Sequence, residues 1–187
     1  MAVTVLISSD EGLEAPIGED EIMRIAAFVL EREGIEIPVE LSVSFVGASE
    51  MRDLNRSWRG IDEPTDVLSF ECDRPDSKDS LAGRPGCEQP LELGDVILAP
   101  EIIAAQATGF KNTAADECRL MLVHGLLHLL GWDHIAEEDA EAMEAREDEL
   151  LRGLGRQRDA RRPIAIAPTT RHPRRTETEG SSCDTGL

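Results

Sequence analysis

An eleven-residue segment, 124–134, reads His-Gly-Leu-Leu-His-Leu-Leu-Gly-Trp-Asp-His and contains three of the four histidines of the chain. His124 and His128 are four residues apart, so on an α-helix their side chains lie on one face, one turn apart. Gly131 can adopt the left-handed conformation that ends a helix. The chain can then turn back and bring His134 to the other two imidazoles.

Three imidazoles around one point are a ligand set for zinc. Neutral histidine nitrogens bind Zn²⁺ at about 2.0–2.1 Å, and three protein ligands leave a fourth position open, as in catalytic rather than structural sites. We therefore predict one zinc ion per chain, held by His124, His128 and His134. The alternative, ordinary histidines on an apolar helix, fits this spacing less well. His172 lies in a polar tail, where we expect no specific role.

The segment has the histidine spacing of the metzincin peptidases, H-E-x-x-H-x-x-G-x-x-H. Gly125 stands where those enzymes have the glutamate that transfers protons during peptide cleavage. A peptidase is therefore the weaker interpretation. Asp133 has two possible roles: to orient a histidine through its free ring nitrogen, or to cap the turn after Gly131.

Length and composition favour one domain that lacks a membrane anchor. A chain of 187 residues with 41% hydrophobic content can build one compact core. It has no apolar stretch long enough for a membrane span and no basic, apolar leader, so we expect a cytoplasmic protein. The four cysteines form no CxxC pair and should remain thiols in a reducing compartment. Cys72 and Cys87 flank a loop and would be the pair to form under oxidation.

Charge divides the chain into an acidic body and a basic tail. Residues 1–155 contain 12 Lys/Arg and 34 Asp/Glu, whereas residues 156–187 contain 7 and 4. An acidic body repels nucleic acid at long range, so RNA binding would depend on a few placed arginines, the metal or the tail. Much of the acidity also serves solubility. We expect residues 154–187 to be disordered, either as an RNA or ribosome tether or, as we favour, as a nonessential extension.

Periodicity predicts a single small mixed β-sheet packed with about five helices, in the α+β or α/β class. The long segment 71–90 is rich in Asp, Gly, Pro and Ser and is predicted to be a loop. Thr113 and Asp116 form the pattern of a capping box before the histidine helix. We expect strands at 2–8, 39–45, 67–70 and 93–99, and helices at 20–32, 49–57, 100–107, 113–130 and 136–151.

Three separated segments together resemble the YbeY family of bacterial endoribonucleases. They are His124–His134, the stretch 54–70 (LNRSWRGIDEPTDVLSF) and 93–97 (LGDVI). The resemblance covers roughly residues 2–153, which we predict to be the catalytic domain. It departs from the family at Glu71, where proline is usual, in the longer loop to Pro90 and in the extra tail.

The resemblance implies a zinc-dependent hydrolase specific for single-stranded RNA. Its implied roles are maturation of ribosomal RNA, especially the 3′ end of the small-subunit RNA, and disposal of defective ribosomes. It further implies that the small ribosomal subunit and assembly factors are partners and that DNA is not a substrate. For the site, it implies a metalloprotease-like zinc helix with His124, His128 and His134 as ligands, and Arg59 as a catalytic residue. Hydroxide on the metal, Asp133 and the RNA 2′-hydroxyl all remain possible sources of the nucleophile or base.

Two other functions compete with this one. A metal-dependent peptidase-like hydrolase follows from the histidine spacing. A non-catalytic ribosome assembly factor would hold a structural zinc, closed by a fourth ligand such as Cys72 or Asp133. For Arg59, the alternative is a surface arginine paired with Asp62 or Asp66.

Overall fold

The computed structural model describes residues 2–75, 89–110, 112–134 and 136–158. Strands and helices alternate in the first half of the chain, and helices follow one another in the second. The elements in order are β1 (Val3–Ser9), α1 (Glu19–Arg32), β2 (Val39–Phe45), α2 (Ala48–Arg59), β3 (Val67–Glu71), β4 (Leu91–Leu98), α3 (Pro100–Phe110), α4 (Ala114–Leu129) and α5 (Glu137–Arg158).

The four strands form one mixed sheet in the order β1-β2-β4-β3. β1, β2 and β4 are parallel, and β3 lies antiparallel to β4 at the edge of the sheet. This arrangement confirms the predicted small mixed sheet, and the five helices place the fold in the α+β class.

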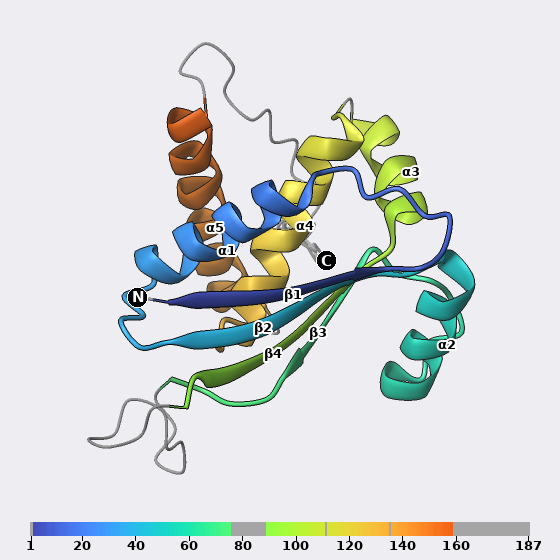
Figure 1. The fold of residues 1–187 in the computed structure, drawn as a ribbon. Helices are drawn as coiled ribbons and strands as arrows, with labels where there is room; N and C mark the ends of the chain where they lie inside the picture. The colour runs from blue at the N-terminus through green and yellow to red at the C-terminus, as the bar shows by residue number, and fades with distance from the viewer. Residues whose placement is uncertain (1, 76–88, 111, 135, 159–187) are drawn as a thin grey trace, which may run out of the picture.

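The helices lie on both faces of the sheet but cover them unequally. Figure 1 shows α1, α4 and α5 over one face, while α2 lies against the other face at the end of the sheet. Alternate residues of β2 are buried, beginning with Val39 and ending with Phe45. Leu68 and Phe70 of β3 pack with a smaller apolar cluster that includes Met51 of α2.

α4 is the central helix of the fold, with contacts to α1, α3, α5, β3 and β4. Its start is the predicted cap: the Thr113 side chain accepts a hydrogen bond from the backbone N–H of Asp116 at 3.0 Å. Leu126 and Leu127, between the two helical histidines, are fully buried. Gly131, with φ +89°, makes the predicted left-handed turn after the helix.

Two predicted helix ends were wrong. α3 continues to Phe110 instead of residue 107, and in the added turn the Thr108 hydroxyl donates a hydrogen bond to the Ala104 carbonyl at 3.1 Å. α5 continues to Arg158 instead of residue 151. Gly153 does not end this helix, since a Cβ there would lie 2.6 Å from the Phe28 ring; the glycine instead permits close packing on α1.

Several expectations concern residues outside the described ranges. The described ranges leave out residues 76–88 of the predicted loop and the tail from residue 159. The predictions of a Cys72–Cys87 pair and of a disordered tail therefore lie outside the described residues. Among the described residues, no helix is both long and apolar enough to cross a membrane.

Candidate metal centre

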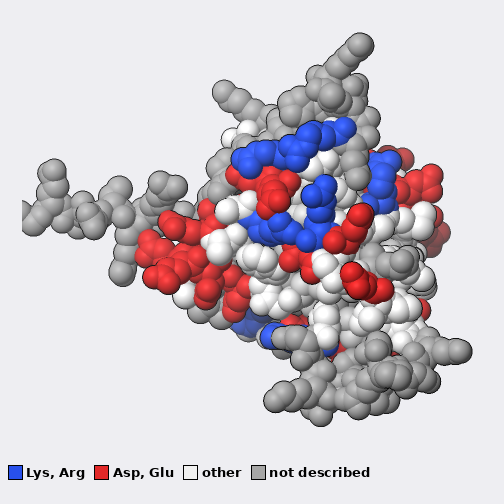
Figure 2. Space-filling model, turned by 90° about the vertical axis from the view of Figure 1, so that its left-hand side faces the viewer, with Lys and Arg blue, Asp and Glu red and all other residues white. Residues whose placement is uncertain are grey.

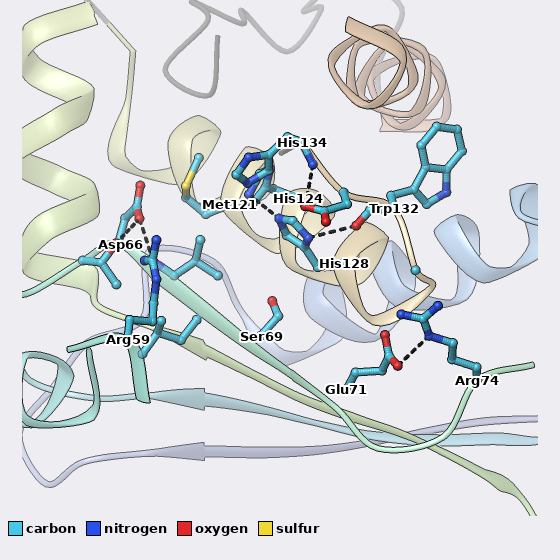
Figure 3. A pocket seen from close by; sticks show the side chains of 15 residues that line it. Arg59, Asp66, Ser69, Glu71, Arg74, Met121, His124, His128, Trp132 and His134 are labelled. Carbon is cyan, nitrogen blue, oxygen red and sulfur yellow. Dashed lines mark hydrogen bonds and ion pairs between the residues drawn. The ribbon is translucent and has the colours of Figure 1, made fainter. Parts of the chain in front are cut away.

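The three predicted histidines meet at the C-terminal end of α4. His124 and His128 project from the last turns of the helix, and His134 returns after the Gly131 turn (Figure 3). Each offers one ring nitrogen, and these three atoms lie within 4.8 Å of one another. The sequence prediction that they converge is therefore confirmed.

The geometry of the cluster suits a tetrahedral divalent ion. The Nε2 atoms of His124 and His128 lie 3.0 Å apart. Two ligands at zinc–nitrogen distances of about 2.05 Å and a tetrahedral angle would have their nitrogens about 3.3 Å apart. A small adjustment of the side chains is enough to bring these atoms to that spacing.

Hydrogen bonds on the far side of two rings leave the Nε2 atoms available as ligands. The Nδ1–H of His128 donates to the backbone carbonyl of Trp132 at 3.0 Å, because a carbonyl oxygen can only accept. The Nδ1 of His124 lies 2.7 Å from Oε1 of Glu147, whose carboxylate likewise accepts. Partners of this kind fix the tautomer and the orientation of a metal-binding histidine.

The His128 imidazole is kept neutral by its surroundings. Burial, followed by the neighbouring His124 and His134, lowers the pKa of His128 to about 4. Metal binding requires the unprotonated ring, so a depressed pKa leaves His128 ready to bind a cation at neutral pH.

Asp133 caps the turn after Gly131, which is the second of its two predicted roles. Its Oδ1 accepts a hydrogen bond from the backbone N–H of His134 at 2.7 Å, which holds the turn that brings the third histidine to the cluster. The carboxylate that orients a histidine is Glu147 of α5, for which no role was predicted from the sequence. Glu147 is only 3% exposed.

A signal for Glu147 is present in the sequence. Met143, Glu147, Leu150 and Leu154 recur at helical spacing, and all four are buried on the inner face of α5. An acidic residue within an apolar stripe is expected to have a buried partner, which here is His124.

The histidines border a cavity of about 750 Å³ that opens along β3. Figure 3 shows the histidines on one side of this cavity, Arg59 toward one end and Arg74 at the other. Arg74 forms an ion pair with Glu71 at 2.6 Å, and neither residue was predicted as part of the site. The lining residues are Arg59, Thr65, Asp66, Val67, Leu68, Ser69, Glu71, Arg74, Met121, His124, His128, Gly131, Trp132, Asp133 and His134.

Arg59 is not the paired surface arginine of the alternative interpretation. Asp62 instead pairs with Arg52 at 2.9 Å and with Arg56 at 3.4 Å. Asp66 accepts from the Thr65 hydroxyl and the Val67 backbone N–H. Within the described ranges no carboxylate forms an ion pair with Arg59, so its guanidinium, at the last residue of α2, can receive an anion in the cavity.

Gly125 shows why the glutamate of the peptidase motif is absent. A Cβ at this position would lie 2.7 Å from Val96 and 3.0 Å from the Ser69 hydroxyl, because α4 lies directly on β3 and β4. A glutamate cannot fit there without moving the helix. The position is therefore a packing site, and the acid–base group required for peptide cleavage is missing.

No fourth protein ligand completes the cluster among the residues that the structure describes. The group of potential ligands contains the three histidines alone, so neither Cys72 nor Asp133 joins it. A bound ion would thus keep a coordination position open toward the cavity, the arrangement of catalytic rather than structural sites.

Comparison with known proteins agrees with this geometry. The family model described as Endoribonuclease YbeY matches residues 8–155. An Endoribonuclease YbeY of Legionella pneumophila (strain Corby) is 37% identical over 155 residues, covering 83% of this chain and 92% of the relative. One of Mycobacterium sp. (strain KMS) is 35% identical over 151 residues, covering 80% and 82%.

A solved structure shares the fold. The solution structure of a Thermotoga maritima protein aligns with a TM-score of 0.54 and 23% identity, covering 90% of this chain and all of that one. With the family match over most of its length, the chain belongs to the Endoribonuclease YbeY family.

Proposed function

We propose that this protein is a zinc-dependent endoribonuclease that cleaves single-stranded RNA. The observation that carries the proposal is that Arg59, which pairs with no carboxylate of the described residues, lines the same cavity as the His124, His128 and His134 cluster, in a chain of this family. A metal-binding group and a phosphate-binding group then face one substrate position.

His124, His128 and His134 would hold the ion, one per chain. When bound, a zinc ion acts as a Lewis acid toward the scissile phosphate and lowers the pKa of water. Three neutral nitrogen ligands and an open position fit this metal. Metal analysis of protein purified without added zinc tests its identity.

Arg59 would bind the phosphate as a planar fork with two parallel N–H donors. Negative charge grows on the phosphoryl oxygens during cleavage, so a fixed guanidinium stabilises the transition state more than the ground state. Glu147 and the Trp132 carbonyl hold the histidines in the required orientation and do not contact the substrate.

We propose ribosomal RNA as the substrate, with maturation of the small-subunit 3′ end, ribosome quality control and a cytoplasmic location following from the family resemblance. The charge distribution supports presentation of the RNA by the ribosome and its assembly factors. The chain has a net charge of −19, and on the face shown in Figure 2 basic side chains are interleaved with acidic ones. Such a surface captures free RNA weakly.

The first experiment compares zinc-loaded wild type with His128→Ala, purified identically, on an unstructured single-stranded RNA and on a duplex. We expect wild type to cleave the single strand but not the duplex, and we expect the variant to be folded but inactive. The product ends then identify the nucleophile, because a 2′-hydroxyl attack leaves a cyclic phosphate. Equal cleavage by both proteins would reveal a contaminant and remove support for the proposal, as would no cleavage by either.

A further inference from the structure

The two tryptophans of the chain have different environments. The Trp132 indole N–H donates to Glu33 at 3.0 Å, and the ring packs against the core. Trp58 is 69% exposed, more than any other large hydrophobic residue that the structure describes. Large aromatic side chains are normally buried or covered by a partner, so an exposed tryptophan beside a functional cavity indicates a binding role.

Trp58 is held in place although it is exposed. Its ring meets the edge of the Phe70 ring, with centroids 5.3 Å apart and planes at 61°. The loop after α2 is tied back to the helix, because Arg52 pairs with Asp62 and the Asn55 side chain donates to the Glu63 carbonyl at 2.7 Å. A pre-organised aromatic ring loses little freedom when a ligand stacks on it.

The position of Trp58 relates it to the proposed phosphate site. It directly precedes Arg59, which lines the histidine cavity. Val67, Leu68 and Ser69 of β3 also line that cavity, whereas Phe70, which contacts Trp58, packs with the cluster beside α2. Trp58 therefore lies across the edge strand β3 from the histidines.

The size and chemistry of this patch favour a nucleobase over a protein. A specific protein interface buries about 800 Å² on each partner, far more than Trp58 and its exposed neighbour Ile61 offer. One base needs only one aromatic face, and Arg59 next to it suits the phosphate of the same chain. Bases in a duplex are stacked on each other and cannot reach such a platform.

We infer that Trp58 is the stacking platform for one unpaired nucleobase next to the scissile phosphate. The inference rests on the proposed function and adds a specificity-determining residue to it. Because only an unstacked base can occupy the platform, Trp58 contributes to the selection of single strands.

The test measures binding of three short oligonucleotides of equal length at low salt: oligoadenosine, oligouridine and an abasic ribose-phosphate chain. All carry 2′-O-methyl groups, and gels verify that they remain intact. Wild type should bind adenosine most tightly and the abasic chain most weakly. Trp58→Ala should weaken binding of oligoadenosine about tenfold and leave the abasic chain unchanged, whereas Trp58→Phe should retain most of the affinity. Circular dichroism checks folding.

Phe110→Ala is the matched control, since Phe110 is an exposed aromatic residue at the end of α3, near the start of α4 and remote from the histidines. It should bind like wild type. If Trp58→Ala and wild type bound oligoadenosine with equal affinity, the stacking site would be refuted and the proposed function would stand. A protein would then be the expected partner of the patch. An equal loss for all three oligonucleotides would also overturn the stacking site. Failure of wild type to bind any of them would overturn the stacking site, whereas the cleavage comparison with His128→Ala decides the proposed function separately.

Discussion

Arg59 and Glu147 differ in how they relate to the histidine cluster. Arg59 is exposed in the cavity, where a substrate phosphate can reach it, and no described carboxylate neutralises it. Glu147 is buried and reaches the site only through His124. Substitution at the first should change RNA cleavage, whereas substitution at the second should change the metal affinity.

Arg59→Ala should lose most RNA cleavage while it keeps its fold and its metal. Removal of a preorganised group that stabilises transition-state charge lowers kcat roughly 10²- to 10³-fold. Arg59→Lys should also be impaired, because a point ammonium cannot reproduce the bidentate fork. Single-turnover cleavage assays and metal analysis measure these effects.

Arg152→Ala is a suitable control for Arg59, since Arg152 is an exposed arginine of α5 that pairs with Asp148. It should cleave RNA like wild type. Full activity of Arg59→Ala would remove this residue from the mechanism, and full activity of Arg59→Lys would reduce its role to simple charge.

Glu147→Gln should bind zinc roughly 10- to 100-fold more weakly, the usual effect of removing a carboxylate behind a ligating histidine. The amide can still accept a hydrogen bond from His124 but carries no charge. Competition with a chromophoric chelator measures the affinity. Glu141→Gln, an exposed position on the same helix, should leave it unchanged, and equal affinities of the two variants would show that Glu147 only fills space.

At the scale of elements, the contact of α4 with the sheet determines where the histidines lie. The helix approaches β3 and β4 so closely that Gly125 contacts Val96 and Ser69 with no room for a side chain. The same contact places His124 and His128, on either side of Gly125 in the sequence, at the cavity beside β3. Packing and site geometry therefore depend on one glycine.

Gly125→Ala should destabilise the protein by about 1–3 kcal/mol, as expected for overpacking of a well-packed core. Gly109→Ala is the control in another helix: a Cβ at Gly109 has nothing within 4 Å, so the better helix propensity of alanine should stabilise by about 0.5–1 kcal/mol. Urea denaturation measures both changes. If both variants gained stability, the close approach of α4 to the sheet would be refuted.

At the scale of the whole molecule, α5 completes the domain. It carries Glu147 to the histidine cluster, and its last turns pack through Gly153 and Leu154, which is 5% exposed. The predicted division into a catalytic domain of residues 1–153 and a tail of residues 154–187 stays a proposal. The helix itself continues to Arg158, so a cut at 158 is the better test of that division.

A chain ending at residue 158 should keep the stability and RNA cleavage of the full protein. A chain ending at residue 151 loses the burial of Leu154, worth about 1.5–3 kcal/mol, and should unfold at a temperature lower by roughly 3–12 °C. Thermal denaturation by circular dichroism compares the three lengths. Loss of cleavage in the 158-residue chain would instead support the tail as an RNA or ribosome tether.

Local signals in the sequence predicted that the three histidines converge and which elements carry them. The i, i+4 spacing, the cap at Thr113 and the turn at Gly131 all act within about twenty residues, so they can be read before any tertiary contact is known. The alternation in β2 and the order of strands and helices likewise predicted one mixed sheet.

Tertiary structure alone decided the rest of the site. Glu147 reaches His124 from another helix, and Arg59 and His134 line one cavity whose wall includes β3. The last helix continues past its predicted end at residue 151, and Gly153 lets it pack closely on Phe28 of α1. These features depend on contacts between residues far apart in the chain, and the periodicity and spacing within a segment do not encode which distant side chain will lie opposite.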